Sequence, residues 1–112
     1  MGTFTKGEVV LFPFPYTNQG GQKLRPCLVL SDEMRTDILL CQITSQNIAK
    51  DSYSVDLGQH ETENGSLLID SYIRSNMLFT ADKSQIVKKL CRITNAKYQQ
   101  VVKKIIEIIS KK

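Results

Sequence analysis

The stretch Lys23-Leu24-Arg25-Pro26-Cys27-Leu28-Val29-Leu30-Ser31 joins a polar, glycine-rich segment to a run of apolar residues. Proline is tolerated at the first residue of a strand, so Pro26 and the apolar run predict the start of a buried strand. Arg25 therefore lies where a loop, residues 17–22, enters a sheet. A guanidinium at such a place can bind a phosphate with two hydrogen bonds, or it can simply be a surface arginine at a strand end.

Apolar runs on both sides of this stretch predict further strands. Residues 7–14 form a mainly aliphatic and aromatic run that ends at Pro13 and Pro15, which cannot donate to a ladder. With residues 24–31 this run predicts a long antiparallel hairpin. The remaining strands are predicted over residues 38–44, 53–57, 66–70, 71–80 and 86–93.

One long amphipathic helix is predicted from Asn95 to about Ser110. Thr94 is a favourable N-cap, and apolar residues recur along one side at three- and four-residue spacing. They are Tyr98, Val101, Val102, Ile105, Ile108 and Ile109. The lysines of this helix are expected to form a solvated face. About seven short strands followed by one helix predict a mainly β protein, a small and strongly curved antiparallel sheet or barrel with the helix packed on it.

Length and composition favour a single domain covering residues 1–112. The 41% hydrophobic and 23% charged content is ordinary for a globular protein. No apolar run approaches the roughly 20 residues of a membrane span, and no signal-peptide pattern is found, so a cytoplasmic protein without a membrane partner is expected. A net charge of +4 is compatible with an anionic partner such as nucleic acid, without requiring one.

The spacing of cysteine and histidine argues against a metal site. Cys27, Cys41 and Cys91 each lie in or beside an apolar run and form no Cys-x-x-Cys pair, so buried free thiols are expected. The single histidine, His60, lies in a polar loop and is interpreted as a surface residue rather than a catalytic base. Glycine-rich phosphate loops are also absent, so no metal and no cofactor is expected.

Three polar groups at strand ends suit phosphate chemistry. Arg25, Thr44 with Ser45, and Arg74 converge at one rim if the strands pair in a tight barrel. An arginine can stabilise negative charge that develops on a phosphorane-like transition state, and a hydroxyl can position a phosphate oxygen. In RNA the 2′-hydroxyl supplies the nucleophile, so neither a metal nor a nucleophilic side chain is needed.

Three blocks of the sequence together resemble the MazF/PemK toxins of type II toxin–antitoxin systems. Residues 6–14 followed by residues 23–31 are similar to the family's opening strand, loop and Arg-Pro strand. Leu40-Cys41-Gln42-Ile43-Thr44-Ser45-Gln46 is similar to its third strand. The third block begins at Ser71-Tyr72-Ile73-Arg74 and continues to the last strand and helix. In order and spacing the blocks match the family over nearly the whole chain.

The resemblance implies an SH3-like small antiparallel β-barrel with a C-terminal α-helix, usually a homodimer. It implies a sequence-specific, metal-independent endoribonuclease that cleaves single-stranded RNA and leaves a 2′,3′-cyclic phosphate and a 5′-hydroxyl. A cognate antitoxin protein would bind the dimer and block its RNA groove. The family's catalytic arginine matches Arg25, its catalytic threonine matches Thr44, and a second arginine of some members matches Arg74.

Residues beside these positions are candidates for RNA binding. They are Gln22, Lys23, Ser45, Gln46, Asn76 and Lys88. Lys88 and Lys89 can touch the RNA backbone or merely be exposed. Phe12, Phe14 and Tyr16 are interpreted as core or dimer-interface residues rather than as platforms for base stacking.

Three departures from the family's pattern favour a PemK-like branch. The family's loop Glu-Gln-x-Gly-x-Arg-Pro reads Gly20-Gly21-Gln22-Lys23-Leu24-Arg25-Pro26 here, so its acidic residue is absent. Asn76 stands where some members have an aspartate, and Phe79-Thr80-Ala81-Asp82 stands where they have Arg-Thr-Ile-Asp. These changes leave the general base unassigned.

Arginine and threonine are poor bases at neutral pH. Arg25 is therefore assigned to charge stabilisation, Thr44 to orienting the scissile phosphate and Arg74 to phosphate binding. A second hypothesis is a non-catalytic toxin of the same fold that binds a protein target such as DNA gyrase. A third is a generic small β-barrel interaction module, because fold alone does not fix function.

Overall fold

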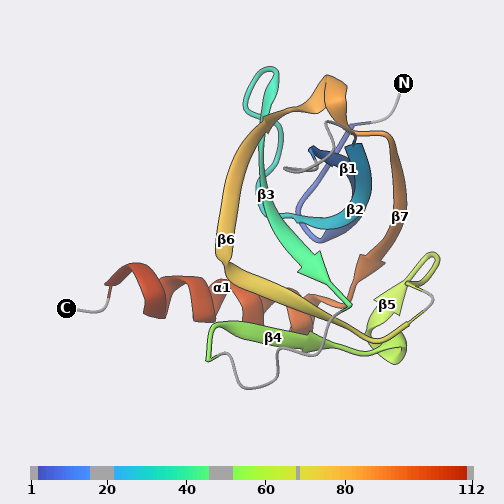
Figure 1. The fold of residues 1–112 in the computed structure, drawn as a ribbon. Coiled ribbons are helices and arrows are strands. Elements are labelled where there is room, and N and C mark those ends of the chain that lie inside the picture. The colour runs from blue at the N-terminus through green and yellow to red at the C-terminus, as the bar shows by residue number, and fades with distance from the viewer. Residues whose placement is uncertain (1–2, 16–21, 46–51, 68, 111–112) are drawn as a thin grey trace.

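The computed structural model describes residues 3–15, 22–45, 52–67 and 69–110 (Figure 1). The strands are β1 (Glu8–Pro15), β2 (Gln22–Val29), β3 (Asp37–Thr44), β4 (Ser54–Leu57), β5 (Thr62–Glu63), β6 (Ser71–Asp82) and β7 (Lys88–Ile93). The helices are the short 3₁₀ turns η1 (Gln59–Glu61) and η2 (Lys83–Gln85) and the long helix α1 (Asn95–Ser110). The mainly β fold with one C-terminal helix is thus confirmed.

The seven strands form one antiparallel sheet with the order β4-β6-β3-β2-β1-β7-β5. The sheet curls strongly, so that β7 and β6 bend round toward each other in Figure 1. β1 and β2 form the predicted hairpin, with Val9 opposite Leu28 at one end and Pro15 opposite Gln22 at the other. β1 also pairs with β7, near the other end of the chain, with a shift in register between Val9 and Val10.

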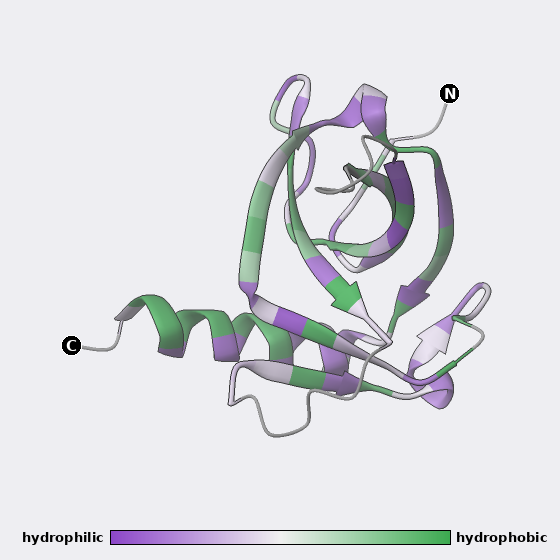
Figure 2. Cartoon of the chain, viewed as in Figure 1, coloured by the Kyte–Doolittle hydropathy of each residue, from purple (hydrophilic) through white to green (hydrophobic). Residues whose placement is uncertain are grey.

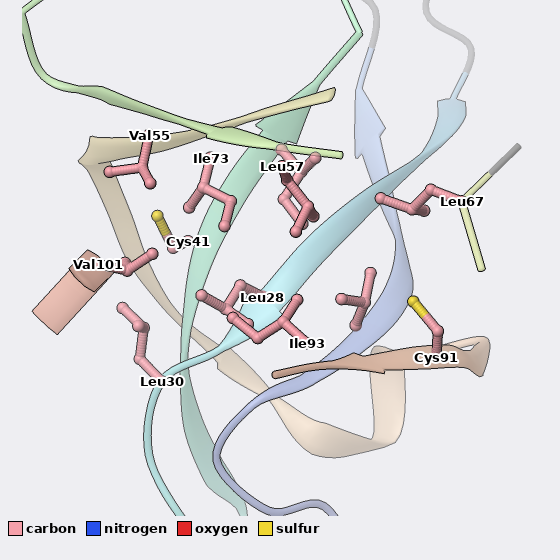
Figure 3. Close-up of a cluster of buried hydrophobic side chains, with 12 residues drawn as sticks. Leu28, Leu30, Cys41, Val55, Leu57, Leu67, Ile73, Cys91, Ile93 and Val101 are labelled. Atoms are coloured by element: carbon pink, nitrogen blue, oxygen red, sulfur yellow. The ribbon is translucent and has the colours of Figure 1, made fainter. Parts of the chain in front are cut away.

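Each face of the central strands carries its own apolar cluster, because successive residues of a strand point to opposite faces. The first cluster, drawn in Figure 3, includes Val9, Leu28, Cys41, Ile43, Ile73 and Val101. The second cluster includes Val10, Phe12, Cys27, Val29, Ile38 and Leu40. The three cysteines are buried free thiols, as expected, and burial raises the pKa of Cys27 and of Cys41 to about 12.

Helix α1 begins where the sequence predicts and packs on the first cluster. The Thr94 hydroxyl accepts a hydrogen bond from the Lys97 N–H at 3.3 Å, which caps the helix. Tyr98 donates its hydroxyl to the Leu30 carbonyl at 2.6 Å, and Val101 is fully buried. Figure 2 shows hydrophobic and hydrophilic residues alternating along α1, as expected of a helix with one buried side.

We expect Val101→Ala to lower the free energy of unfolding by about 2 kcal/mol, because it removes two buried methyl groups and leaves a cavity under α1. Val87→Ala is the matched control, since it makes the same change at a position that is 52% exposed. Urea unfolding followed by circular dichroism measures both. Equal losses in the two variants would contradict the packing described for Val101.

The long strand β6 contains a large bulge that changes its direction. Ile73 of β6 pairs with Ile43 of β3 and Leu78 pairs with Cys41, so residues 74–77 stand against Gln42 alone. Bulges bend a strand and increase its twist. β6 therefore turns sharply beside α1 in Figure 1, and its first part also pairs with β4.

Two sequence predictions about strands were wrong. The described residues of the range 66–70 lie in no strand, although Leu67 is buried in the first cluster. The polar segment around His60, interpreted from the sequence as a loop, spans residues 58–65 and contains η1 and the short strand β5, which pairs with β7. Its residues are polar, so no apolar pattern indicates this pairing.

The expected solvated face of α1 was also partly wrong. Lys97 is only 5% exposed, and its Nζ lies 3.0 Å from Glu61 Oε2 and 3.8 Å from Asp56 Oδ1. This ammonium group therefore joins α1 to η1 and to β4. Of the other lysines in the described helix, Lys103 is exposed and Lys104 is half-buried.

Candidate functional site

Arg25 lies on β2, directly opposite Phe12 of β1, and is half-buried. Among the residues that the structure describes, no carboxylate forms an ion pair with its guanidinium, whereas Lys83, Lys89 and Lys97 each pair with a glutamate. A partly desolvated guanidinium without a protein carboxylate is suited to binding an external anion.

Arg25 and Thr44 lie on neighbouring strands, each two residues beyond the last pair of β2 and β3. β2 and β3 pair as far as Cys27 opposite Gln42, and the same register continued by two residues sets Arg25 beside Thr44. Both residues fall on the face of the second cluster, because Cys27 and Leu40 belong to it and side chains alternate along a strand. The pairing of β2 with β3 ends at Cys27 and Gln42, so the meeting of Arg25 and Thr44 stays a prediction.

A row of three directly opposed residues extends from Thr44 across the sheet. Thr44 of β3 is opposite Tyr72 of β6, and Tyr72 is opposite Asp56 of β4. Opposed residues in an antiparallel pair share a face, so Thr44, Tyr72 and Asp56 lie side by side. We call these three residues the Thr44 row.

Arg74 lies two residues beyond Tyr72 on β6 and so on the same face. It is half-buried and opposite Ser54 of β4, and its carbonyl accepts a hydrogen bond from the Cys41 thiol at 2.9 Å. This hydrogen bond fixes the backbone of Arg74 at the start of the bulge, on the strand next to β3.

Three aromatic side chains lie on the face of the sheet that carries Arg25. The rings of Phe12, Phe14 and Phe79 lie with centroids 5.3–5.7 Å apart in edge-on or tilted contacts. Phe12 is buried and Phe14 packs against the second cluster, which agrees with their interpretation as core residues. Tyr16, grouped with them, lies outside the described residues.

The predicted RNA-binding residues fall into two groups. Gln22 and Lys23 are exposed at the start of β2, with Lys23 opposite Phe14, and Ser45 is exposed just after Thr44. These three lie near the ends of the strands that carry Arg25 and Thr44. Gln46 lies outside the described residues.

Asn76 and Lys88 lie elsewhere. Asn76 is exposed in the bulge of β6 and lines a cavity of about 470 Å³ with residues of α1, including Lys104. Lys88 is opposite Leu11 of β1, whereas Arg25 is opposite Phe12, so the register sets Lys88 and Arg25 on opposite faces. The structure does not bring these two residues to Arg25 and Thr44, and their role in RNA binding stays a prediction.

Sequence reasoning missed a cavity of about 230 Å³ that adjoins the Thr44 row. Its lining residues are Asp56, Leu57, Gly58, His60, Asp70, Ser71 and Tyr72. Alternation along residues 53–57 indicated which residues of β4 face outward, but no sequence signal paired β4 with β6. His60 is exposed, in agreement with its interpretation as a surface residue.

Within the described ranges, no group of three or more His, Cys, Asp or Glu side chains is placed to hold a metal ion. The described helices also include none that is both long and apolar enough to cross a membrane.

Solved structures with this fold include several toxins. The MazE–MazF complex from Deinococcus radiodurans (form III) is 20% identical to this chain, with a TM-score of 0.78, and the match covers 97% of this chain and 98% of that one. An endoribonuclease from Mycobacterial species, in complex with its cognate antitoxin, is 16% identical, with a TM-score of 0.71 and coverage of 98% and 96%. The Mycobacterium tuberculosis toxin MazF-mt6 is 13% identical, with a TM-score of 0.68 and coverage of 90% and 96%.

At such low identities these structures establish the fold alone, and no curated protein matches the chain at a significant level. The family follows from the sequence match, because residues 5–109 fit the family model described as PemK-like, MazF-like toxin of type II toxin–antitoxin system. The chain therefore belongs to the PemK-like, MazF-like toxins of type II toxin–antitoxin systems.

Proposed function

We propose that this toxin is a metal-independent endoribonuclease that cleaves single-stranded RNA at short sequences. The observation that carries the proposal is that Arg25 and Thr44 lie on the same face of two neighbouring strands, β2 and β3. The guanidinium has no carboxylate partner among the described residues, so a phosphodiester can occupy its hydrogen-bond donors.

In the proposed reaction the 2′-oxygen of a ribose attacks the adjacent phosphorus and the bond from phosphorus to the 5′-oxygen breaks. The 2′-hydroxyl loses its proton and the leaving 5′-oxygen gains one, which gives a 2′,3′-cyclic phosphate and a 5′-hydroxyl. Arg25 stabilises the charge that develops on the non-bridging oxygens. Thr44 orients the scissile phosphate through its hydroxyl, and Arg74 binds a phosphate on the same face.

Neither Arg25 nor Thr44 is suited to accept the 2′-proton, because a charged guanidinium has no free lone pair and a neutral hydroxyl is a very weak base. The proposal therefore leaves this proton to solvent or to a group of the substrate. Gln22, Lys23 and Ser45, near the same strand ends, are proposed to contact the RNA strand. Their exposure is compatible with this role.

The proposal includes a homodimer and a cognate antitoxin as protein partners. One mycobacterial relative was solved in complex with its cognate antitoxin. On this chain, four apolar side chains of β6 and α1 are between 37% and 73% exposed, and a protein partner would cover them favourably. They are Met77, Leu78, Ile106 and Ile109.

The test is incubation of the purified protein with a pool of single-stranded RNAs in EDTA. Cleavage at recurrent short sequences, with cyclic-phosphate and 5′-hydroxyl ends, is the expected result. Intact RNA across varied sequences would contradict the proposal. Capture of a protein target without any cleavage would instead favour a non-catalytic toxin.

We expect Thr44→Val to reduce kcat/KM for RNA cleavage roughly 10- to 100-fold, because valine keeps the shape but loses the hydroxyl that orients the phosphate. Thr44→Ser should retain most of the activity. Thr80→Val, an exposed position on β6, is the matched control and should cleave like the wild type. An unchanged rate for Thr44→Val would show that the hydroxyl has no role.

A further inference from the structure

The Thr44 row leads from the proposed cleavage position into the cavity of about 230 Å³. Neighbouring strands lie about 4.8 Å apart, so Tyr72 is one strand and Asp56 two strands away from Thr44. A nucleotide whose phosphate is held at Thr44 can therefore place its base in the cavity.

The walls of the cavity combine one aromatic side chain with two carboxylates. Tyr72 is half-buried, and Asp56 and Asp70 flank it. Asp70 Oδ1 accepts a hydrogen bond from the Gln59 N–H at 3.3 Å, which orients that carboxylate. Asp56 is 78% exposed, and its Oδ1 lies 3.8 Å from Lys97 Nζ. Lys97 is closer to Glu61, at 3.0 Å, so its pairing with Asp56 is the weaker of the two. Both carboxylates keep the capacity to accept further hydrogen bonds, because each has about four lone-pair sites.

Such walls suit a nucleobase better than a phosphate. Proteins read single-stranded RNA by stacking bases on aromatic side chains and by hydrogen bonds to the base edges. Carboxylates repel phosphate but accept hydrogen bonds from a base, so the phosphates are drawn to Arg25 and Arg74 while the base faces the aspartates. His60, at the rim, packs closely over Gly58, where an added Cβ would lie 2.8 Å from the imidazole Cε1.

The donor pattern of each base decides which one fits. Guanine presents an imino N–H and an amino group side by side on its Watson–Crick edge, which match a carboxylate that only accepts. Uracil presents one imino N–H between two carbonyl oxygens, which a carboxylate repels. We propose that this cavity binds the base of a nucleotide next to the scissile phosphate and prefers guanine to uracil. This inference rests on the proposed ribonuclease function.

The first experiment compares cleavage of RNAs that carry guanine or uracil at each position flanking the cut. Wild-type protein should favour guanine at one of these positions. Asp56→Asn combined with Asp70→Asn should reduce that preference roughly tenfold, because the amide also donates and no longer selects donors. Asp37→Asn, which removes an exposed carboxylate at the far end of β3, is the matched control and should keep the wild-type preference.

Tyr72 has its own test. Tyr72→Ala should weaken the binding of RNA about tenfold through loss of stacking, whereas Tyr72→Phe keeps the aromatic face and should bind like the wild type. If Tyr72→Ala and Tyr72→Phe bind RNA equally, stacking in this cavity is ruled out.

A second experiment separates this inference from the proposed function. Fluorescence anisotropy measures the binding of 2′-O-methyl RNA hexamers, which cannot be cleaved, with guanine or uracil at the same position. If the wild type cleaves RNA but the double variant keeps the wild-type base preference, the inference is wrong and the ribonuclease stands. If no RNA is cleaved, the ribonuclease proposal fails, and the binding of the hexamers alone tests the base preference of the cavity. A preference of the wild type for guanine that is lost in the double variant supports the inference. Equal binding of the guanine and uracil hexamers by the wild type refutes it.

Discussion

Arg25→Ala is expected to reduce kcat/KM for RNA cleavage by about 10²- to 10³-fold, the loss found when one preorganised donor to a developing oxyanion is removed. Arg25 is half-buried against Phe12, so its charge is only partly screened by water. Its donors point to no carboxylate among the described residues, and a phosphodiester would therefore meet an unoccupied guanidinium. The effect should lie mainly in kcat, because the charge is larger in the transition state than in bound RNA.

Arg25→Lys keeps the charge but loses the two-pronged donor geometry, and should recover only part of the activity. Lys103→Ala removes one positive charge from the exposed side of α1 and should leave cleavage unchanged. Circular dichroism of each variant verifies folding. Wild-type rates in a folded Arg25→Ala protein would exclude Arg25 from the chemistry.

Lys97→Ala is expected to lower the free energy of unfolding by about 3 kcal/mol, the lower end of the range for a broken buried ion pair. Lys97 is 5% exposed and Glu61 is 23% exposed, and their charged atoms are 3.0 Å apart. Removing the ammonium leaves the Glu61 carboxylate poorly solvated and without its cation. Lys104→Ala breaks a surface pair with Glu107, at 3.4 Å, and should change stability by no more than about 0.5 kcal/mol.

The same variant should alter the acid sensitivity of the fold. Partial burial, the largest single influence, acts to raise the pKa of Glu61, but hydrogen bonds from the Gly58 N–H and from Lys97 outweigh it, and the pKa is lowered. A lowered pKa in the folded state stabilises the fold above the ordinary value of 4.5, and this contribution is lost as the pH falls through the folded pKa.

As the pH falls from about 5 to about 3, the Lys97→Ala protein should therefore lose less of its folding stability than the wild type does. Urea unfolding at a series of pH values measures this difference. Parallel pH profiles for the two proteins would contradict the role given to Lys97.

The strands predicted correctly are those whose own residues carry the signal. Residues 9–14 and 26–30 are continuous apolar runs on either side of a turn segment, and Thr94 marks the start of α1 on its own. Leu67 misled the prediction because burial does not require a strand. Lys97 misled it because a charged residue is buried only when partners from distant segments, here Glu61 and Asp56, surround it.

The candidate site was predictable only in part for a similar reason. Arg25 and Thr44 stand out in a sequence motif, and their strands are neighbours in the sheet. Tyr72 stands opposite Thr44 because the bulge shifts the register of β6 against β3, and Asp56 joins them because β6 also pairs with β4. A bulge depends on the packing of several strands, so neither apolar periodicity nor turn residues reveal it.

The pairing of β1 with β7 also bears on how this toxin is made. Val9 finds Cys91 only after nearly the whole chain has been synthesised, which takes several seconds at about 5–20 residues per second. Contacts so distant in sequence slow folding, and refolding in milliseconds to seconds is expected rather than in microseconds. The sheet that carries Arg25 is thus complete only when the last strand has left the ribosome, and a nascent, unfinished chain is not expected to cut RNA.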